Sequence, residues 1–304
     1  MITPPLVACV ILNFSRVDDT LECLRSLRAS TYPNLRVWVL DYQRAPDGES
    51  AMRAILPRVE VVPLAENRGY AGNNNIGIQL AIDAGAEWVF VLNDDVVLAP
   101  ETIGALIEVG TTDPAIAFLG PLVLHADEPT VIQSAGGRLS HDWRTGHIAQ
   151  NQRDTGQFTG PVAVSWISGC AILARAAAVR SIGLMDERFF LYWEETEWCL
   201  RAAQAGWTIV FVPAARTWHK GVQRDYRPGP AVTYFSTRNR LLLLSTRGAP
   251  LRAWVVAWLQ ILRTLASWTL RPKWHAKRAH RDAMRQGLQD FLAGRFGPRP
   301  PAAP

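Results

Sequence analysis

Two pairs of neighbouring carboxylates have the clearest capacity for chemistry in this chain. Asp94 and Asp95 interrupt an apolar run that resumes at Val96, and Glu194 and Glu195 form a second acidic cluster further along. Ionised groups at the end of a buried strand are costly unless a ligand offsets their charge. A divalent cation that also binds phosphate is the usual ligand of this kind. The first pair therefore indicates a site for a metal ion and a nucleotide diphosphate.

The surrounding pattern places the first pair at one edge of a sheet. We expect strands over 6–12, 36–40, 59–63 and 87–92, and helices over 18–29 and 73–84. This alternation predicts an α/β fold, with a mainly parallel sheet flanked by helices on both faces. Ligands of such sheets bind beyond the carboxyl ends of the strands. The polar residues at those ends are Asn13, Asp41, Asn67, Asp94 and Asp95.

Composition and charge restrict the class of protein. The chain has 304 residues, of which 48% are hydrophobic and 19% charged, which predicts a packed core rather than disorder. Residues 271–304 hold eight Lys or Arg and two Asp, so this tail is +6 while the whole chain is +5. The four cysteines form no Cys-x-x-Cys pair, and the first five residues lack the basic start of a signal peptide. We therefore expect a cytoplasmic protein with reduced cysteines. We also expect the basic tail to have a binding partner of its own.

The C-terminal part predicts a surface-active helix. Trp254, Trp258, Ile261, Leu265 and Trp268 fall on one face at helical spacing, and arginines lie opposite. A tryptophan face beside a basic tail is typical of a helix in the interface of an anionic membrane. Packing on the catalytic domain or on a second copy of the chain is the alternative. Residues 121–160 look like an irregular insertion that builds an acceptor site, and residues 297–304 look disordered.

Several motifs follow one another in an order that resembles the family 2 glycosyltransferases, in particular their rhamnosyltransferase-like branch. In chain order they are 7–14, Asp41, 67–77, 92–95, 166–171, 183–190, 193–201 and His219. The resemblance implies a GT-A (nucleotide-diphospho-sugar transferase) fold over 1–230, with a donor half up to about residue 100 and an acceptor half after it. A helical membrane-interface region would cover 231–296, and a separate disordered tail would cover 297–304.

The resemblance also implies a division of labour between the two acidic clusters. Asp95 would hold a divalent metal, Mg²⁺ or Mn²⁺, with His219 completing the site, and a structural histidine is the alternative for His219. Asn93 stands where the family's Asp-x-Asp signature has its first aspartate, so Asn93 is expected to touch ribose instead. Glu195 would be the base that takes the proton of the acceptor hydroxyl, and Glu194 is the other candidate.

Further site residues follow from the same motifs. Donor contacts are expected from Asn13, Asp41, Asn67, Gly69, Gly72, Asn75, Asn93, Asp94, Ser168 and Gly169. Acceptor contacts are expected from Trp166, Trp193 and Arg238. Ordinary structural roles compete with these, such as turns for Asp41 and Gly69, core packing for the tryptophans and a surface ion pair for Arg238. Residues 42–44 depart from the family pattern and leave the nucleobase open.

The resemblance therefore implies an inverting, metal-dependent glycosyltransferase. It would move a sugar such as rhamnose from a nucleoside-diphosphate sugar to a hydroxyl of a lipid-linked or cell-envelope saccharide, on the inner face of the plasma membrane, with a homodimer left open. A sugar nucleotidylyltransferase is one alternative, but residues 13–16 lack its glycine-rich loop. Nucleic-acid binding is suggested by the pI near 9.3. The basic residues, however, lie beside a tryptophan-rich helix and not along a stacking groove, so no nucleic-acid partner is expected.

Overall fold

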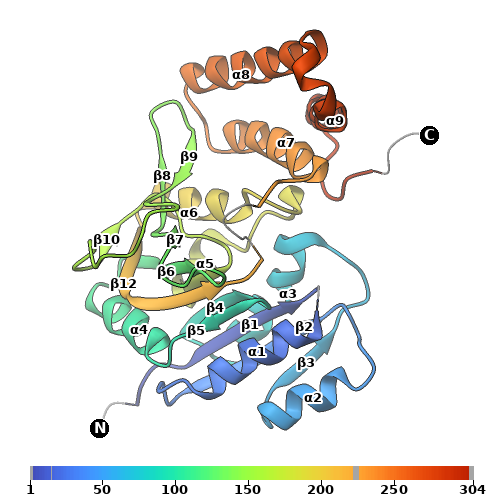
Figure 1. The fold of residues 1–304 in the computed structure, drawn as a ribbon. Helices are drawn as coiled ribbons and strands as arrows, with labels where there is room; N and C mark the ends of the chain where they lie inside the picture. Colours follow the sequence, from blue (N-terminus) through green and yellow to red (C-terminus); the bar gives the residue numbers. More distant parts are fainter. Residues whose placement is uncertain (1–2, 15, 222–225, 301–304) are drawn as a thin grey trace.

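The computed structural model describes residues 3–14, 16–221 and 226–300. A large mixed sheet with helices on both faces forms the body of the molecule, and three C-terminal helices pack together at one end (Figure 1). The strands are β1 (Val7–Asn13), β2 (Leu35–Asp41), β3 (Glu60–Pro63), β4 (Trp88–Asn93), β5 (Val96–Leu98), β6 (Ile116–His125), β7 (Ile132–Ser134), β8 (Gly137–Leu139), β9 (Thr145–His147), β10 (Val162–Ala163), β11 (Ala171–Arg175) and β12 (Thr208–His219). The helices are α1 (Val17–Arg28), α2 (Gly48–Ile55), α3 (Gly69–Asp83), α4 (Thr102–Thr112), α5 (Ala176–Ile182), α6 (Glu194–Gln204), α7 (Pro230–Thr246), α8 (Leu251–Leu270) and α9 (Arg278–Leu292), with short 3₁₀ turns η1 (Glu187–Phe189) and η2 (Pro272–Lys277).

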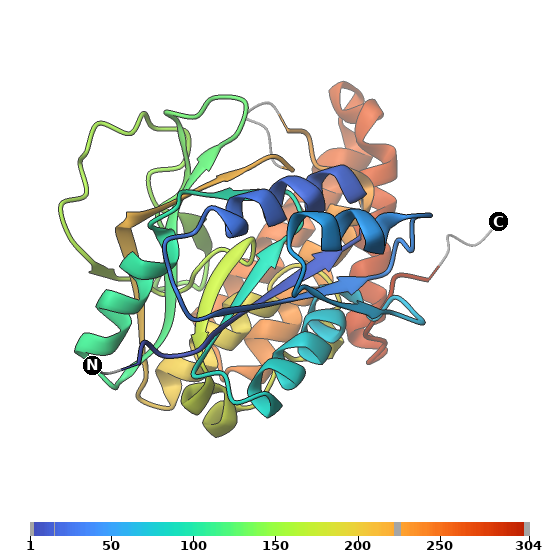
Figure 2. The same ribbon diagram turned by 90° about the horizontal axis from the view of Figure 1, so that it is seen from below.

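The main sheet has the strand order β10-β12-β6-β11-β4-β1-β2-β3. Its β3-β2-β1-β4 part is parallel, as the alternation of strands and helices predicts, and helices cover it on both faces (Figure 2). β11 runs antiparallel to both β4 and β6, so the sheet is mixed, and beyond β11 the strands β6 and β12 are again parallel to each other. β1 is buried along its full length, which explains its continuous apolar sequence.

The register of the parallel strands brings the expected polar residues to one edge. Asn13 lies opposite Asp41, and Leu12 lies opposite Asn93. α3 then begins at Gly69, earlier than the expected start at residue 73, so Gly69 and Gly72 belong to its first turns. The carboxyl ends of β1, β2 and β4 thus form the floor of a common site.

The expectation of an irregular insertion over 121–160 is wrong for its first part. Residues 121–125 complete the fully buried strand β6, and β7 pairs with β6, so only the later part of 121–160 is irregular around the β8–β9 hairpin. β12 runs from Thr208 to His219. An irregularity after Val212 lets the strand continue to His219, and its last residues pair with β5. His219 is therefore fixed by a sheet and does not lie in a loop.

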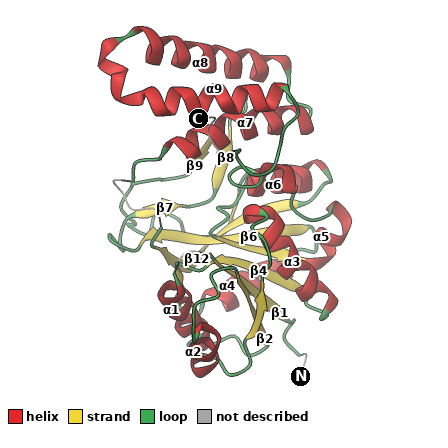
Figure 3. Cartoon of the chain, turned by 90° about the vertical axis from the view of Figure 1, so that its right-hand side faces the viewer, coloured by secondary structure: helices red, strands yellow, loops and turns green. Residues whose placement is uncertain are grey.

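The C-terminal helices correct the prediction for the tryptophan face. α8 lies farthest from the sheet (Figures 1 and 3), yet the face with Trp254 and Ile261 is turned toward α7 and α9. Trp254 packs against Phe291 with ring centroids 6.2 Å apart, and Ile261 is buried. A different face of α8 is exposed, and its apolar residues are Leu251, Val255, Leu259, Leu262 and Leu270. Among the described residues, no helix is long and apolar enough to cross a bilayer.

The expected disordered tail is wrong for residues 297–300. The Gly297 carbonyl accepts a hydrogen bond from Arg238, and Arg299 donates to Gln286 of α9. These contacts fold the segment back onto α7 and α9. Residues 301–304 of the expected tail lie outside the described part of the chain.

Candidate active site

A cavity of about 340 Å³ lies beyond the carboxyl ends of β1 and β4. Its lining includes five of the expected donor and metal residues, namely Asn67, Gly69, Asn93, Asp94 and Asp95. The backbone N–H of Phe14 donates to Asp94 Oδ2 at 3.2 Å, which fixes the first carboxylate against the end of β1. We call this cavity the donor pocket.

Asn13 and Asp41 lie next to the donor pocket and are hydrogen-bonded to each other. Asn13 Nδ2 donates to Asp41 Oδ1 at 2.9 Å, and the Arg44 backbone N–H donates to the same oxygen at 3.0 Å. Phe14 and Tyr42 stack above them with ring centroids 5.1 Å apart. The stacked pair is exposed, so it offers a flat apolar surface beside the carboxylate.

A second cavity, of about 380 Å³, contains the other acidic cluster. Glu194, Glu195, Ser168, Gly169 and His219 all line it. The two cavities share Tyr70, Asn93, Asp95 and Leu191. The second cavity, which we call the base pocket, is therefore continuous with the donor pocket at Asn93 and Asp95.

The junction of the two pockets has the composition of a small metal site. His219 Nε2 lies 3.1 Å from Asp95 Oδ1 and 3.4 Å from Asn93 Nδ2, while His219 Nδ1 lies 3.0 Å from Gln133 Oε1. The contact between Asp95 and His219 is a hydrogen bond that lowers the pKa of Asp95 against the effect of burial, and the same two side chains would offer one oxygen and one nitrogen ligand to a Mg²⁺ or Mn²⁺ ion. A Cβ added to Gly221 would come within 2.3 Å of Asp95 Oδ2, so glycine keeps this position open. The described residues hold no cluster of three or more His, Cys, Asp or Glu, so the remaining ligands would come from phosphate and water.

Burial raises the pKa of both glutamates. Burial raises the pKa of Glu195 to about 7, against hydrogen bonds from nearby backbone N–H groups and from Thr196 that lower it. Glu194 is more deeply buried, and burial together with the charge of Glu195 holds its pKa well above the usual range. A carboxylate with a pKa near neutrality suits a general base, because it is ionised in use and still attracts a proton.

A strained segment precedes the glutamates and positions them. Phe190, Tyr192 and Trp193 all have positive φ, at 63°, 67° and 79°. Such backbone is costly for residues with a side chain and persists only where the surroundings impose it. Trp193 is the residue before α6, so this bend aims Glu194 and Glu195 into the base pocket.

α7 supplies the groups that impose the bend. Asn239 Nδ2 lies 2.8 Å from the carbonyl oxygens of Phe189, Leu191 and Tyr192. Arg238 donates to the Phe189 carbonyl at 3.0 Å and to the Arg188 carbonyl at 3.3 Å. Sequence reasoning missed Asn239, although an asparagine next to an arginine inside an apolar helix is an unusual pair.

Gly69 brings α3 against the same segment. It has φ +76°, and a Cβ there would come within 2.2 Å of the Phe190 carbonyl oxygen. The next backbone N–H, from Tyr70, donates to that oxygen at 2.6 Å. Only glycine allows this approach, which joins the donor pocket to the strained segment.

Several expected site residues have structural contacts instead. Asn75 is buried, donates to the Met185 carbonyl at 2.9 Å and accepts from the Met185 N–H at 3.0 Å, and Gly72 faces Arg68 and Glu187. Neither residue lines the donor pocket.

The expected acceptor residues are also placed elsewhere. Arg238 is fully buried, and its guanidinium donates hydrogen bonds to the backbone carbonyls of Phe189 and Gly297, so it is not available to an acceptor. Trp166 is buried against Gly137, and Trp193 lines a separate cavity between α7 and α8.

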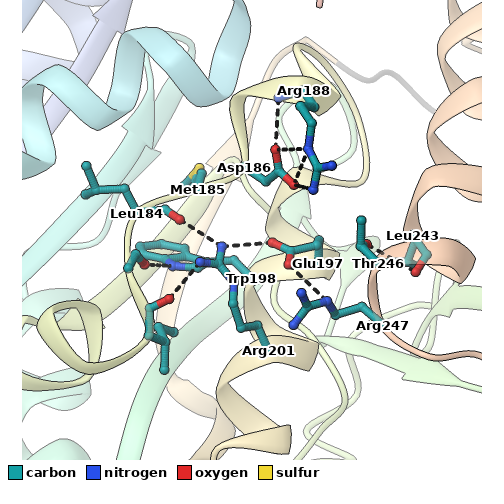
Figure 4. A network of polar contacts seen from close by, with 12 residues as sticks. Leu184, Met185, Asp186, Arg188, Glu197, Trp198, Arg201, Leu243, Thr246 and Arg247 are labelled. Carbon is teal, nitrogen blue, oxygen red and sulfur yellow. Dashed lines mark hydrogen bonds and ion pairs between the residues drawn. The ribbon is translucent and has the colours of Figure 1, made fainter. Parts of the chain in front are cut away.

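Glu197 belongs to the framework and not to the reaction. Its side chain is buried, with Arg201 Nη2 2.9 Å from Oε2 and Arg247 Nε 3.2 Å from Oε1 (Figure 4). Arg201 also donates to the carbonyls of Ile182 and Leu184. This network joins α6 to the end of α7 and the segment before η1, which leaves Glu194 and Glu195 as the acidic pair in the base pocket.

A polar cavity at the carboxyl ends of parallel strands, joined to a second cavity with two glutamates, is the arrangement expected of a nucleotide-sugar-dependent transferase of the GT-A type. The sequence comparison agrees with this class, because residues 4–240 match the family model "Glycosyltransferase like family 2". The chain therefore belongs to the family 2 glycosyltransferases. This membership confirms the predicted family and enzyme class and decides against the nucleotidylyltransferase and nucleic-acid-binding alternatives.

Curated relatives include rhamnosyltransferases. The chain is 29% identical over 230 residues to N-acetylglucosaminyl-diphospho-decaprenol L-rhamnosyltransferase of Mycobacterium tuberculosis, covering 69% of this chain and 74% of the relative. It is 24% identical over 251 residues to dTDP-rhamnosyl transferase RfbF of Shigella flexneri, covering 79% and 82%.

Solved structures confirm the GT-A-like fold. A mannosyltransferase of Pyrobaculum calidifontis, in complex with GDP-Man and Mn²⁺, matches with a TM-score of 0.58 at 14% identity, over 95% of this chain and 88% of that one. GalNAc-T7, in complex with UDP, GalNAc and Mn²⁺, matches with a TM-score of 0.64 at 14% identity, over 98% and 59%.

Proposed function

We propose that this enzyme is an inverting, metal-dependent transferase that moves a deoxyhexose such as rhamnose from a nucleoside diphosphate to an acceptor hydroxyl. The observation that carries the proposal is the junction at Asp95, where the donor pocket meets Glu194 and Glu195, and burial raises the pKa of Glu195 to about 7. The donor pocket and the base pocket meet at Asp95. This arrangement suits direct displacement, in which the acceptor attacks as the diphosphate leaves.

In this reaction Glu195 takes the proton of the attacking hydroxyl, and its burial keeps its pKa above the usual range of a glutamate. Asn93 and Asp94 would orient the nucleotide, and Asp95 and His219 would hold a Mg²⁺ or Mn²⁺ ion. The bound ion would neutralise charge on the departing diphosphate. Ser168 and Gly169 form the wall between Tyr70 and Glu195, where the sugar would lie.

The substrates are proposed from the relatives. One relative is named for transfer of rhamnose to an N-acetylglucosaminyl-diphospho-lipid, and another for dTDP-rhamnose. We propose dTDP-rhamnose as the donor and a diphosphate-linked lipid saccharide of the cell envelope as the acceptor.

The test is a transfer assay over a panel of nucleotide sugars, with a short-chain lipid diphosphate carrying N-acetylglucosamine and with added Mn²⁺. We expect free dTDP, a rhamnosylated product with inverted anomeric configuration, and loss of turnover in EDTA. Release of pyrophosphate, or retention of configuration, would overturn the proposal.

We also propose a place for the enzyme on the cytoplasmic face of the membrane. The exposed apolar face of α8 has its residues at spacings of three, four and eight, so they form one stripe along the helix. Leu251 and Leu270 are 78% and 77% exposed, and the helix contains two arginines and no acidic residue. An apolar stripe with a basic surround suits an anionic lipid surface, where a lipid-linked acceptor would be found.

A further inference from the structure

A third cavity, of about 590 Å³, lies between α7 and α8 and has no role in the donor chemistry. It adjoins the base pocket, because Val232 lines both, and Trp193 in its wall directly precedes Glu194. Anything bound there would therefore lie beside the group that activates the acceptor. We call this cavity the helical pocket.

The chemistry of the helical pocket favours an anion. Two arginines, Arg240 and Arg263, line it together with the side chains of Thr233, Ser236, Thr237 and Thr264. None of its described lining residues carries a carboxylate. Thr237 donates its hydroxyl to the Thr233 carbonyl, and the Thr233 hydroxyl lies 2.8 Å from His280 Nδ1, so the guanidinium groups and the hydroxyls of Ser236 and Thr264 are the donors left for an anion. Such donors without a carboxylate match phosphate oxygens, which only accept hydrogen bonds.

Arg240 is the lining residue whose hydrogen-bond donors are not all satisfied within the protein. Its Nη1 donates to Gln260 Oε1 of α8, while Nε and Nη2 are buried and have no hydrogen-bond partner among the described residues. Burial lowers the pKa of this arginine. Asp142 lies close enough to favour its charge, but Asp142 is paired with Arg144 at 2.8 Å, and Arg144 opposes that effect. A buried guanidinium with two unsatisfied nitrogens is costly, and an anion in the pocket would relieve that cost once the side chain turns toward it.

From these observations we infer that the helical pocket binds the diphosphate of the lipid-linked acceptor, with Arg240 as its main ligand and Arg263 at its rim. The identity of the ligand as the acceptor rests on the proposed function, but binding of a diphosphate to the helical pocket can be measured without turnover. The sequence motif offers Arg238 and Arg240 as a pair for an acceptor diphosphate, and the structure separates them, because the donors of Arg238 are engaged with the protein while Arg240 has donors without a partner. α8 supplies Arg263 and Gln260 to the pocket and carries the exposed leucine stripe, so one helix would meet the diphosphate and the lipid.

The experiment measures binding of farnesyl diphosphate to the full chain in EDTA, where the donor pocket lacks the cation that it needs for diphosphate. We expect farnesyl diphosphate to bind at least about tenfold more tightly than farnesol, which lacks the anion. Arg240→Gln should weaken farnesyl diphosphate binding by about tenfold or more, and Arg263→Gln by less. Arg180→Gln on exposed α5 makes the same change of net charge far from the pocket and should leave binding unchanged.

Steady-state kinetics provide the second arm. Arg240→Gln should raise KM for the lipid-diphosphate acceptor and leave KM for the nucleotide sugar unchanged, and Arg240→Lys should recover part of the loss. Equal binding by wild type and Arg240→Gln, with a normal unfolding midpoint, would overturn the inference while the transferase proposal stands. Diphosphate binding through Arg240 without any sugar transfer would leave the inference intact and overturn the proposed function. If Arg240→Gln fails to fold, undiminished binding by Arg263→Gln and Arg240→Lys would overturn the inference.

Discussion

Single residues at the junction of the two pockets determine what the site can do. Asp95 and His219 come from β-strand ends that are far apart in sequence, and the sheet brings an oxygen and a nitrogen within 3.1 Å. Glu195 obtains a pKa of about 7 from burial in α6. The same residue types on an exposed surface would have ordinary pKa values and no common ligand.

Replacement of Glu195 by Gln should remove the base and keep the shape of the pocket. We expect turnover to fall by about 10²–10⁴, the usual contribution of a general base, with donor binding unchanged. In the wild type, kcat/KM should rise with pH through about 7 and then level off, because Glu195 acts when ionised. Glu60→Gln, an exposed carboxylate on β3, is the matched control. Near-normal turnover of Glu195→Gln would show that Glu195 is not the base and would assign that role to Glu194.

Gly221→Ala tests the metal site without touching a ligand. The added Cβ would lie 2.3 Å from Asp95 Oδ2 and 3.4 Å from His219 Nε2, so the carboxylate must move. We expect Mn²⁺ affinity, measured by electron paramagnetic resonance with nucleoside diphosphate present, to fall by about tenfold or more. Gly160→Ala, where a Cβ meets nothing within 4 Å, should leave the affinity unchanged. Unaltered affinity in Gly221→Ala would place the ion elsewhere.

At the scale of elements, the strained segment before α6 depends on α7. Three residues with positive φ bring the start of α6 to the base pocket, and Arg238 and Asn239 hold the carbonyls of that segment. We regard both as positioning residues, because they act on Glu195 through the backbone that precedes it. α7 therefore supports the proposed base in two ways, by holding the segment before α6 and by placing Val232 in the lining of the base pocket.

Asn239→Ala should uncouple the segment from α7. Three carbonyls would lose a buried donor, and we expect a loss of about 1–3 kcal/mol in the free energy of unfolding, measured in urea. Turnover should fall, and the midpoint of its pH profile should shift because the surroundings of Glu195 change. Ser245→Ala on the same helix removes a hydroxyl that bonds only to Leu242 of its own helix, and it should do neither. A stability loss with an unchanged pH profile would show that Asn239 is structural only.

At the scale of the whole molecule, the C-terminal helices give the enzyme two distinct ends. The sheet with its pockets forms one part, and α8 forms the outer edge of the other (Figure 3). The basic residues of 271–304 follow this helix directly, so charge and exposed leucines share one end. An enzyme that takes a lipid-linked acceptor needs such an orientation, because the acceptor is confined to the membrane surface.

Leu259→Gln with Leu262→Gln tests this orientation. Both side chains are more than half exposed, so the fold should tolerate the change, while lipid binding should lose at least about tenfold. Flotation with vesicles that contain anionic phospholipid measures the effect, and wild-type binding should weaken as salt rises. Leu292→Gln, an exposed leucine of α9, is the control. Unchanged flotation of the double variant, or a stable wild-type dimer that dissociates in it, would assign the stripe to another partner.

Much of the donor side could be predicted from the sequence. The strands before Asn13, Asp41 and Asp94 are apolar runs with polar ends, and local patterns of this kind determine where parallel strands place their ligands. The C-terminal side was harder to predict. Helical spacing identifies an amphipathic face on α8, but the tryptophan face packs on α7 and α9, because a bulky apolar face stabilises a helix bundle as well as it binds lipid.

The sequence by itself determined the family, the parallel half of the sheet and the two acidic clusters, because each depends on residue types at short spacing. Only the tertiary structure decided which groups meet. It brought His219 to Asp95 across an irregularity in β12, assigned Arg238 to the backbone before α6, and left the Arg240 guanidinium partly unsatisfied in a pocket. Such contacts join residues far apart in the chain, and burial sets their pKa values and hydrogen-bonding needs, which no local pattern contains.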